Sequence, residues 1–414
     1  MEQERIQRNL WSLLWVGWIA IALSQVLSFG YGMMVPGIIE SFAIDYTRIG
    51  RVGSFAAWVA VVANIPISGL AARSNPKFAL PVIYALVGVG CVIFGAARSL
   101  AGLYIGRIIS GIAGSGLISA LVTVKMRWIP QSRMEGVNGI ENFVQPIGQT
   151  CATLCMAQLM AILGGWRGVY FAISALMFCC AVLWFFAFGN VNRNVPPLRV
   201  AETAVKEGKE EGEIGIMKAL LMALKKPTVL LYGLAYPGKI IIWIGFFYYF
   251  PSFFMEVRGF TAAQAGLATG LFPVFSALAS IVSPKIAKRF DLNKSLLVGS
   301  GILLCAGYFA MLKISALWLI CVISAITGFL SYIATPVYFT NMYRLDLPPR
   351  AVQMATSVLL TMVSVGSALG AGIIGSVIDT LGFNRGLLFA CFTPLWFALF
   401  TAVSPDVKKM NKGK

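Results

Sequence analysis

Long apolar stretches alternate with short polar or Gly/Pro-rich connections along the whole chain, and each is long enough to cross a membrane as a helix, which takes about 20 residues. The stretches form two sets of six. The first set covers 11–39, 50–71, 78–97, 101–124, 135–162 and 167–188, and the second covers 228–254, 262–284, 295–312, 315–340, 351–378 and 386–403. The pattern predicts an all-α integral membrane protein with twelve transmembrane helices in two six-helix bundles.

The break between the two sets predicts three parts of the chain. We expect an N-terminal bundle over 1–190, a cytoplasmic linker over 191–227 and a C-terminal bundle over 228–414. The linker is the only substantial polar stretch. Its last part, 214–226, places Lys218, Lys225 and Lys226 among apolar residues, which is typical of a helix in the membrane interface. Pro227 is expected to end that helix before the seventh span.

Composition excludes a soluble protein, because 58% of the residues are hydrophobic, 12% are charged and the mean hydropathy is +0.81. The net charge of +17 could indicate a nucleic-acid partner, so its location matters. With the amino terminus cytoplasmic, 24 of the 33 Lys and Arg residues fall on the cytoplasmic side. This asymmetry follows the positive-inside rule. We therefore expect a cytoplasmic-membrane protein with both termini cytoplasmic and no nucleic-acid partner.

The residue types give little support for a metal site or for enzymatic catalysis. The chain has no histidine, and its eight cysteines lie in apolar stretches without a CxxC pair. A Ser-His-Asp set and a Gly-rich phosphate loop are also missing from the sequence. We predict no metal, no cofactor and no enzymatic activity.

The two halves resemble each other, which is typical of transporter architectures. Residues 163–172, LGGWRGVYFA, match residues 381–390, LGFNRGLLFA, at an offset of 218. Gly50 similarly matches Gly266. A weaker match at an offset of 214 pairs three residues of the fourth span with three of the tenth: Leu103, Ser110 and Gly114 with Leu317, Ser324 and Gly328. These offsets predict duplicated, pseudo-symmetric halves.

Three local motifs resemble signatures of the major facilitator superfamily. The fourth span reads RIISGIAGSG from Arg107, similar to the family's RxxxG…G pattern, and 165–167 read GWR at the family's junction before the sixth span. The loop after the second span, 68–77, is a degenerate form of the GxLaDRxGrk loop and includes Arg73 and Lys77. Ala72 stands where the family has Asp, and the C-terminal counterpart, 284–289 with Arg289, also lacks an acid.

The resemblance implies two six-helix bundles that rock about a central solute path, so that the path opens to one side at a time. Arg73, Lys77 and Arg289 would belong to the loops that stabilise one conformation. Because the family's Asp takes part in that stabilisation, its replacement puts this latch in doubt for the present chain.

Lys239 is the most informative residue of the sequence. It lies 11 positions after the start of the seventh span, or about 17 Å deep at 1.5 Å per residue. A Lys at such a depth costs about 2.5–3.5 kcal/mol on insertion scales, so it needs a reason to be there. Pro237 and Gly238 would weaken the helix beside it, as in the discontinuous helices of transporter sites. Contact with substrate or coupling ion, an internal ion pair and snorkelling are the three alternatives.

Arg107 is a second cation inside a span, and helix packing or ligand contact would each explain it. Glu141, early in the fifth span, is the only carboxylate plausibly embedded. It could carry a coupling proton, or it could pair with Arg127 or Arg133 at the interface. Two cations against one acid leave the core positive, which favours an anionic solute such as a mono- or dicarboxylate.

Further candidates for substrate contact are polar or aromatic residues in spans one, five, seven and ten. Packing or an interfacial belt is the alternative for each aromatic side chain. These candidates are Tyr31, Gln145, Tyr236, Trp243 and Tyr332.

The sequence therefore predicts a monomeric secondary active transporter in contact with membrane lipid. It would move a small organic anion by alternating access, as antiport or proton symport. The alternative is a multidrug or small-molecule proton antiporter of the same fold, for which 145–148, QPIG, partly matches an exporter pattern. A channel or receptor is a third class, which duplicated halves without a sensing domain do not favour.

Overall fold

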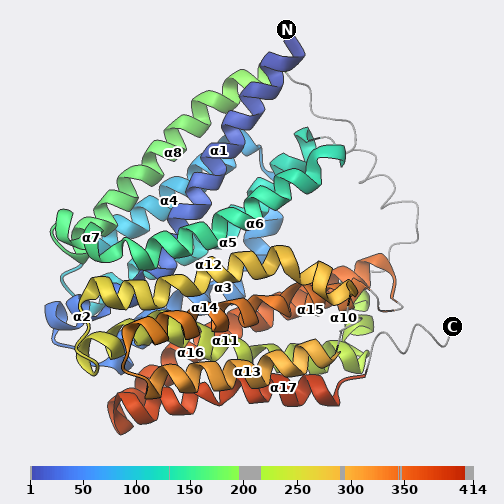
Figure 1. The fold of residues 1–414 in the computed structure, drawn as a ribbon. Coiled ribbons are helices and arrows are strands. Elements are labelled where there is room, and N and C mark those ends of the chain that lie inside the picture. The colour runs from blue at the N-terminus through green and yellow to red at the C-terminus, as the bar shows by residue number, and fades with distance from the viewer. Residues whose placement is uncertain are drawn as a thin grey trace.

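The computed structural model describes residues 2–129, 131–194, 216–289, 294–343, 345 and 347–405, and within these ranges it contains helices and no strands. The N-terminal half has eight helices, labelled as in Figure 1. They are α1 (Glu2–Phe29), α2 (Tyr31–Phe42), α3 (Tyr46–Arg73), α4 (Pro76–Ala96), α5 (Leu100–Trp128), α6 (Gln131–Leu154), α7 (Met156–Ile162) and α8 (Trp166–Asn194).

The linker and the C-terminal half contribute the remaining helices. They are α10 (Ile216–Leu224), α11 (Pro227–Glu256), α12 (Ala262–Arg289), α13 (Lys294–Lys313), α14 (Leu317–Ile333), α15 (Thr335–Tyr343), α16 (Pro349–Cys391) and α17 (Thr393–Val403). Helix α10 lies inside the interfacial helix predicted over 214–226, while linker residues 195–215 lie outside the described residues.

Short polar residues mark where several helices begin. The side chains of Asp45 and Asn75 accept hydrogen bonds from the backbone N–H groups of Arg48 and Lys77, at 2.7 and 3.0 Å. Ser99 caps α5 in the same way. An N-cap oxygen satisfies one of the N–H groups that a helix leaves without an internal partner. The connections between spans are therefore short and defined by local sequence.

The all-α membrane fold is confirmed, although the number of transmembrane helices is not twelve by a strict criterion. Each predicted span falls on helical residues. By length and composition, eight helices of the described chain could cross a membrane, or nine when α1 and α2, bent by 50°, count as one span. A break accounts for part of the difference, because α6 and α7 divide one predicted span, whereas the span over α14 and the start of α15 is counted despite its break. Conversely, α16 contains two spans joined at Gly382, whose φ is 79°.

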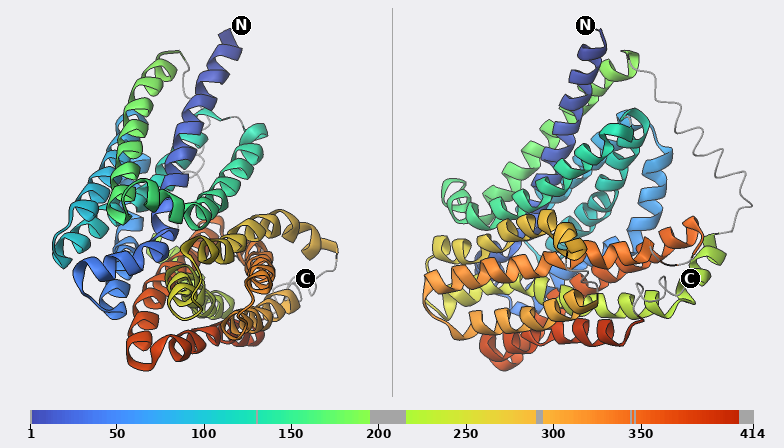
Figure 2. Two further views of the ribbon diagram at one scale, coloured as in Figure 1. Left: turned by 60° about the vertical axis from the view of Figure 1, so that its left-hand side comes forward. Right: turned by 45° about the vertical axis from the view of Figure 1, so that its right-hand side comes forward.

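Helices α1 to α8 and helices α10 to α17 form two groups that lie against each other (Figures 1 and 2). The groups touch through α3 with α16, α6 with α12 and α2 with α11. We call the end where α8 finishes and α11 begins the terminal end, and the end with loops 43–45, 257–261 and 314–316 the far end. Helices α1, α6 and α8 diverge from the C-terminal group toward the terminal end (Figure 2). The three domain boundaries remain a prediction.

Two glycines that match in the sequence repeat make equivalent contacts between the groups. A methyl group on Gly50 of α3 would lie 2.6 Å from the carbonyl oxygen of Ala371 on α16. On Gly266 of α12 it would lie 2.5 Å from the carbonyl oxygen of Thr153 on α6. Gly266 follows Gly50 by 216 positions and Ala371 follows Thr153 by 218. Both glycines thus permit close backbone approach, and both contacts lie in the far-end halves of their helices.

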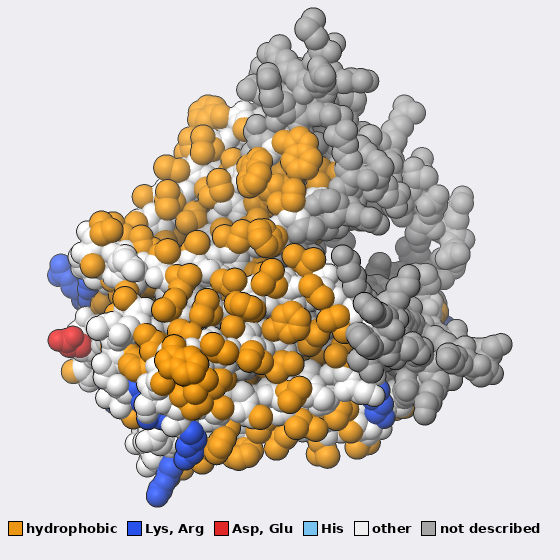
Figure 3. Space-filling model, in the orientation of Figure 1, with side chains coloured by type: hydrophobic (Ala, Val, Ile, Leu, Met, Phe, Trp, Pro, Cys, Tyr) orange, Lys and Arg blue, Asp and Glu red, His pale blue; other side chains and the backbone are white. Residues whose placement is uncertain are grey.

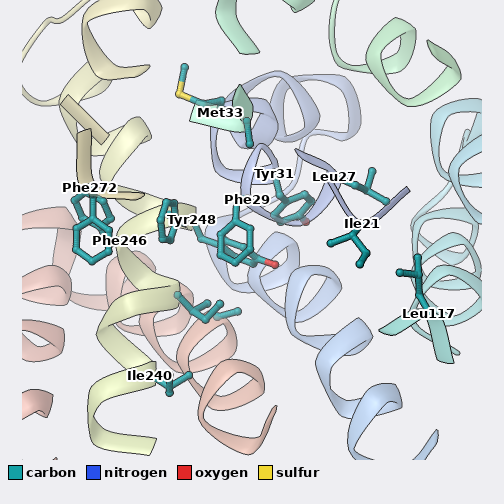
Figure 4. Packing of buried hydrophobic residues seen from close by; sticks show 14 of the residues in the cluster. Ile21, Leu27, Phe29, Tyr31, Met33, Leu117, Ile240, Phe246, Tyr248 and Phe272 are labelled. Atoms are coloured by element: carbon teal, nitrogen blue, oxygen red, sulfur yellow. The ribbon is translucent and has the colours of Figure 1, made fainter. Parts of the chain in front are cut away.

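The outer surface agrees with a membrane environment. Large apolar side chains cover the face seen in Figure 3, and its Lys and Arg side chains lie toward the edges. Inside, aromatic side chains fill the contact between the groups: Figure 4 shows Phe246 beside Phe272, with Phe29, Tyr31 and Tyr248 close by. The ring centroids of Tyr31 and Tyr248 are 5.0 Å apart, across the two groups.

Candidate functional site

Lys239 lies in the middle of α11 and is buried, with 4% of its surface exposed. Its ammonium donates to the carbonyl oxygen of Ser331 and, at 2.8 Å, to the hydroxyl of Thr335. The rings of Tyr236, Tyr332 and Phe397 lie 5.7–6.0 Å from Nζ. Within the described residues no carboxylate pairs with it. The Lys239 ammonium is therefore surrounded by neutral oxygens and ring faces, which attract a cation without cancelling its charge.

The carbonyl that accepts from Lys239 is available because of a break in the neighbouring helix. Helix α14 ends at Ile333 and α15 starts at Thr335, just before Pro336. A helix interruption leaves backbone carbonyls without their usual N–H partners. Our expectation that Pro237 and Gly238 interrupt α11 is wrong, since α11 runs unbroken from Pro227 to Glu256. The discontinuity lies in the helix facing Lys239.

Gly238 has a packing role instead. A methyl group there would lie 2.7 Å from the carbonyl oxygen of Thr393 and 2.9 Å from the backbone nitrogen of Phe397. The missing side chain lets α11 approach α17 closely, which brings the Phe397 ring toward Lys239.

Tyr332 connects the Lys239 cluster with the N-terminal group. Its hydroxyl lies close enough to the side chain of Gln149 on α6 to interact with it. Gln149 is 4% exposed and donates to the side chain of Gln25 on α1 at 3.1 Å. Gln145, predicted as a contact, is half-buried one turn before Gln149, on the same side of α6. Polar side chains of the other group thus lie beside Tyr332, one residue away from the Lys239 cluster.

Arg107 on α5 forms a second cluster, separate from that of Lys239. It is 5% exposed, and its guanidinium carbon lies 4.1 Å from the ring centroid of Tyr31 and 5.2 Å from that of Phe94. It donates to the hydroxyl of Tyr170 at 3.5 Å, while its Nε has no partner. Tyr248 of α11, in the other half, interacts with Arg107 electrostatically and packs against the Tyr31 ring. This arrangement fits packing by cation–π contacts and leaves one donor unused.

Trp243 lies one turn after Lys239 and packs against the other group. Its ring centroid is 5.1 Å from that of Phe29 on α1 and 5.5 Å from that of Phe247. The indole N–H is buried and has no hydrogen-bond partner. A buried donor without a partner is costly, so this N–H is available for a ligand that enters between the groups.

Glu141 forms an ion pair. Its carboxylate lies 2.7 Å from the Lys125 ammonium, and the two residues are 7% and 3% exposed. The structure thus shows Glu141 paired with a cation. Pairing with Arg127 or Arg133, the partners suggested for it, stays a prediction. Their side chains lie outside the described residues, and Lys125 on α5 occupies the carboxylate.

The loop motif is described only in part. Lys77 places its ammonium 5.1 Å from the ring centroid of Phe185 and 5.5 Å from that of Phe78. The side chains of Arg73 and Arg289 lie outside the described residues, although these residues end α3 and α12. A role of the three residues in conformational change stays a prediction.

Some residues of the clusters did not stand out in the sequence. Ser331 and Thr335 hold the Lys239 ammonium, and Tyr170 holds Arg107. The available signal was the position of Ser331 and Thr335 just before Pro336. A Pro inside a span interrupts the helix, so carbonyls shortly before it lack their N–H partners and a nearby cation can use them. Tyr170 had no such signal.

The sequence matches the Major Facilitator Superfamily over residues 17–371 and 260–414, so the chain belongs to this family. It is a multi-pass membrane transporter of small molecules and not an enzyme.

Several known transporters are similar to it. The chain is 28% identical over 130 residues to the nitrate/nitrite transporter NrtP of Picosynechococcus sp., covering 31% of this chain and 24% of NrtP. The chain is 21% identical to the purine ribonucleoside efflux pump NepI of Escherichia coli, and the match covers 98% of this chain and 97% of NepI. The probable sulfoacetate transporter SauU of Cupriavidus necator is 24% identical, over 61% and 60%.

Solved structures support the same fold. A bacterial homolog to the human lysosomal transporter Spinster, in an inward-facing and unoccupied conformation, superimposes with a TM-score of 0.75 at 18% identity, covering 95% of each chain.

Proposed function

We propose that this transporter carries a small organic anion, a mono- or dicarboxylate, and that Lys239 neutralises its charge. The observation that carries the proposal is the surroundings of the Lys239 ammonium, which is buried against a carbonyl, a hydroxyl and three rings. A buried lysine without a counter-ion is unfavourable in the empty protein. A carboxylate beside it would form a charge-assisted hydrogen bond and remove that cost.

Groups from both halves surround the Lys239 region, which suits alternating access. Trp243 offers an unused N–H, and Tyr332 reaches Gln149 of the N-terminal half. An anion held between Lys239 and these donors would draw the two halves together around it. The loaded protein would then close more readily than the empty one, so exchange would be faster than net movement.

The ion pair of Glu141 favours anion exchange over proton symport. A proton carrier inside a membrane protein needs a carboxylate that can take up and release protons during the cycle. The Glu141 carboxylate is engaged in an ion pair with Lys125. The other acids with described side chains lie at or near the ends of spans: Glu40, Asp45, Glu256 and Asp379. The same point disfavours the alternative of a multidrug proton antiporter, which would need such a carrier.

Some relatives have anionic substrates according to their names, which supports an anion here. NrtP is named for nitrate and nitrite, and SauU for sulfoacetate. NepI, which aligns over nearly the whole chain, is named for purine ribonucleosides. The anionic substrate therefore rests mainly on Lys239.

Counterflow in proteoliposomes tests the proposal. Vesicles loaded with one carboxylate are diluted into the same labelled carboxylate, and uptake is compared for wild type, Lys239→Gln and Lys313→Gln. Lys313 is a matched control, since it is an exposed lysine of the same half. We expect Lys239→Gln to lose saturable exchange of every carboxylate and Lys313→Gln to keep it. Normal exchange by Lys239→Gln would refute the role of Lys239.

A further inference from the structure

Asp379 joins the two halves at the far end of the molecule. It lies near the end of the first span of α16, shortly before Gly382, and reaches the first turn of α3 in the other half. Its carboxylate accepts hydrogen bonds from the backbone N–H of Tyr46 at 3.1 Å, from the hydroxyl of Thr47 at 2.5 Å and from the backbone N–H of Thr47. One acidic side chain of the C-terminal half thus satisfies three donors of the N-terminal half.

The start of α3 suits a negative charge. The first N–H groups of a helix have no partners within it, and the helix dipole places partial positive charge there. Asp45 of the same half already caps α3 through the N–H of Arg48. Asp379 uses the N–H groups of the two residues before Arg48, so the helix start is shared between a cap from its own half and one from the other half.

A second contact lies beside the first. The Tyr46 hydroxyl donates to the carboxylate of Glu256, the last residue of α11. The Tyr46 ring packs against Phe383 and Tyr249, with centroids 4.9 and 6.2 Å away. A methyl group on Gly375 would lie 2.5 Å from the Tyr46 carbonyl oxygen. The start of α3 is therefore held by charge, by rings and by close backbone packing, all from the C-terminal half.

At the terminal end, the two loop segments that correspond to the family's acidic motif carry no acid. Ala72 occupies the acidic position of the loop after the second span, and the counterpart over 284–289 contains no carboxylate. Among the described residues, the acidic hydrogen bonds between the halves lie at the far end. Breaking them exposes the N–H groups of α3.

We propose that Asp379, with Glu256 as a weaker second group, latches the far ends of the two halves and makes the far-closed conformation the resting state. With the termini cytoplasmic, as predicted, this state opens toward the cytoplasm. The latch acts without substrate and does not depend on the identity of the transported solute. It sets how often the empty protein exposes the Lys239 region to the far side.

The size of the effect follows from the exposure of the contact. Asp379 is exposed at the surface, so water competes for its hydrogen bonds. A hydrogen bond to a charged acceptor contributes about 1 kcal/mol more than one to a neutral acceptor, including a contribution from the helix dipole. This difference corresponds to about a fivefold change in the ratio of far-open to far-closed protein. Asp379→Asn keeps the shape of the side chain and should produce this change, and Asp379→Ala a larger one.

Distance measurements by double electron–electron resonance test the latch in the absence of substrate. Spin labels are placed at Glu40 and Asn384, exposed far-end residues of the two halves, after replacement of the three exposed cysteines, Cys151, Cys155 and Cys179. We expect a single short distance in the wild type, and a longer distance that gains population about fivefold in Asp379→Asn. Tyr46→Phe, which keeps the ring and loses the bond to Glu256, should shift the same way by less.

Asp45→Asn is the matched control, because it removes a carboxylate from the same helix start without touching a contact between the halves, and Asn remains a good N-cap. It should leave the distances unchanged. The latch is overturned if Asp379→Ala and wild type give the same distances, if Asp45→Asn shifts them equally, or if the long distance dominates in the wild type. None of these results bears on whether Lys239 binds an anion, which counterflow measures separately.

Discussion

Lys125 and Lys239 are two buried lysines of the same protein with opposite surroundings. Lys125, 3% exposed, lies 2.7 Å from the carboxylate of Glu141. Lys239, 4% exposed, contacts the carbonyl of Ser331 and the hydroxyl of Thr335, and within the described residues it has no carboxylate partner. Burial is the same in both cases, so burial alone does not distinguish a structural lysine from a functional one.

The difference lies in the charge that remains. The Lys125–Glu141 pair is neutral as a unit, so it needs nothing further and joins α5 to α6. The Lys239 ammonium has only neutral partners among the described residues, and these would compensate its charge only in part. A protein retains such a charge at a cost to stability where the charge has a use. The two lysines should therefore respond to substitution in opposite ways.

The largest expected effect is the loss of transport on Lys239→Met. Methionine keeps much of the side-chain volume and removes the charge, so carboxylate exchange should fall at least about 100-fold, the equivalent of one charge-assisted hydrogen bond. Stability should stay equal or rise, because no partner is left with an unpaired charge. Counterflow and thermal unfolding in detergent measure the two outcomes. A large loss of stability together with retained exchange would reverse the assignment.

The next largest effect is destabilisation by Lys125→Met. It leaves the Glu141 carboxylate buried without its partner, which costs about 3–5 kcal/mol in soluble proteins. The double variant Lys125→Met/Glu141→Leu removes both charges and should recover most of the lost stability. Thermal unfolding measures both. Transport by the double variant should persist, and its loss would show that the pair belongs to the transport machinery.

A smaller effect is expected from Tyr332→Phe. The change removes one hydroxyl, and with it the interaction with Gln149, but keeps the ring 6.0 Å from Lys239. One hydrogen bond contributes about 1 kcal/mol, so the concentration of carboxylate for half-maximal exchange should rise about fivefold. The melting temperature should hardly move. An unchanged concentration dependence would remove Tyr332 from the substrate path.

The smallest effect is expected from Thr335→Val. It removes the hydroxyl 2.8 Å from the Lys239 ammonium and leaves the Ser331 carbonyl in place. Lys239 then has one acceptor fewer in the empty protein, so a carboxylate should bind slightly more tightly, by about twofold. Equilibrium binding of labelled carboxylate to purified protein measures this. Weaker binding would indicate that Thr335 itself contacts the solute.

The hydrophobic pattern predicted the helical spans and the burial of Lys239 and Arg107, because both properties follow from position along a membrane helix. The partner of Glu141 was not predictable from spacing. Lys125, Arg127 and Arg133 all lie near it in the sequence, and the contact with Lys125 depends on how α5 packs against α6. The interruption beside Lys239 was sought in its own helix, at Pro237, but that helix is continuous and the interruption occurs before Pro336 instead.

The contacts at the far end were also not predictable from the sequence. Asp379 and Tyr46 are 333 positions apart, and neither stands in a recognisable motif. The matching of Gly50 with Gly266 was visible as a repeat, whereas their shared function, close contact with a backbone carbonyl of the opposite half, requires the three-dimensional arrangement. Long-range pairs of this kind depend on how two bundles meet.

The most direct test of the central claim is ligand-dependent thermal stability of wild type, Lys239→Gln and Lys125→Met/Glu141→Leu against a panel of mono- and dicarboxylates. A ligand present at 100 times its dissociation constant stabilises by about 2.7 kcal/mol, which gives a measurable shift in melting temperature. We predict that at least one carboxylate stabilises wild type and the double variant, and fails to stabilise Lys239→Gln. Equal stabilisation of Lys239→Gln by that carboxylate would contradict the account.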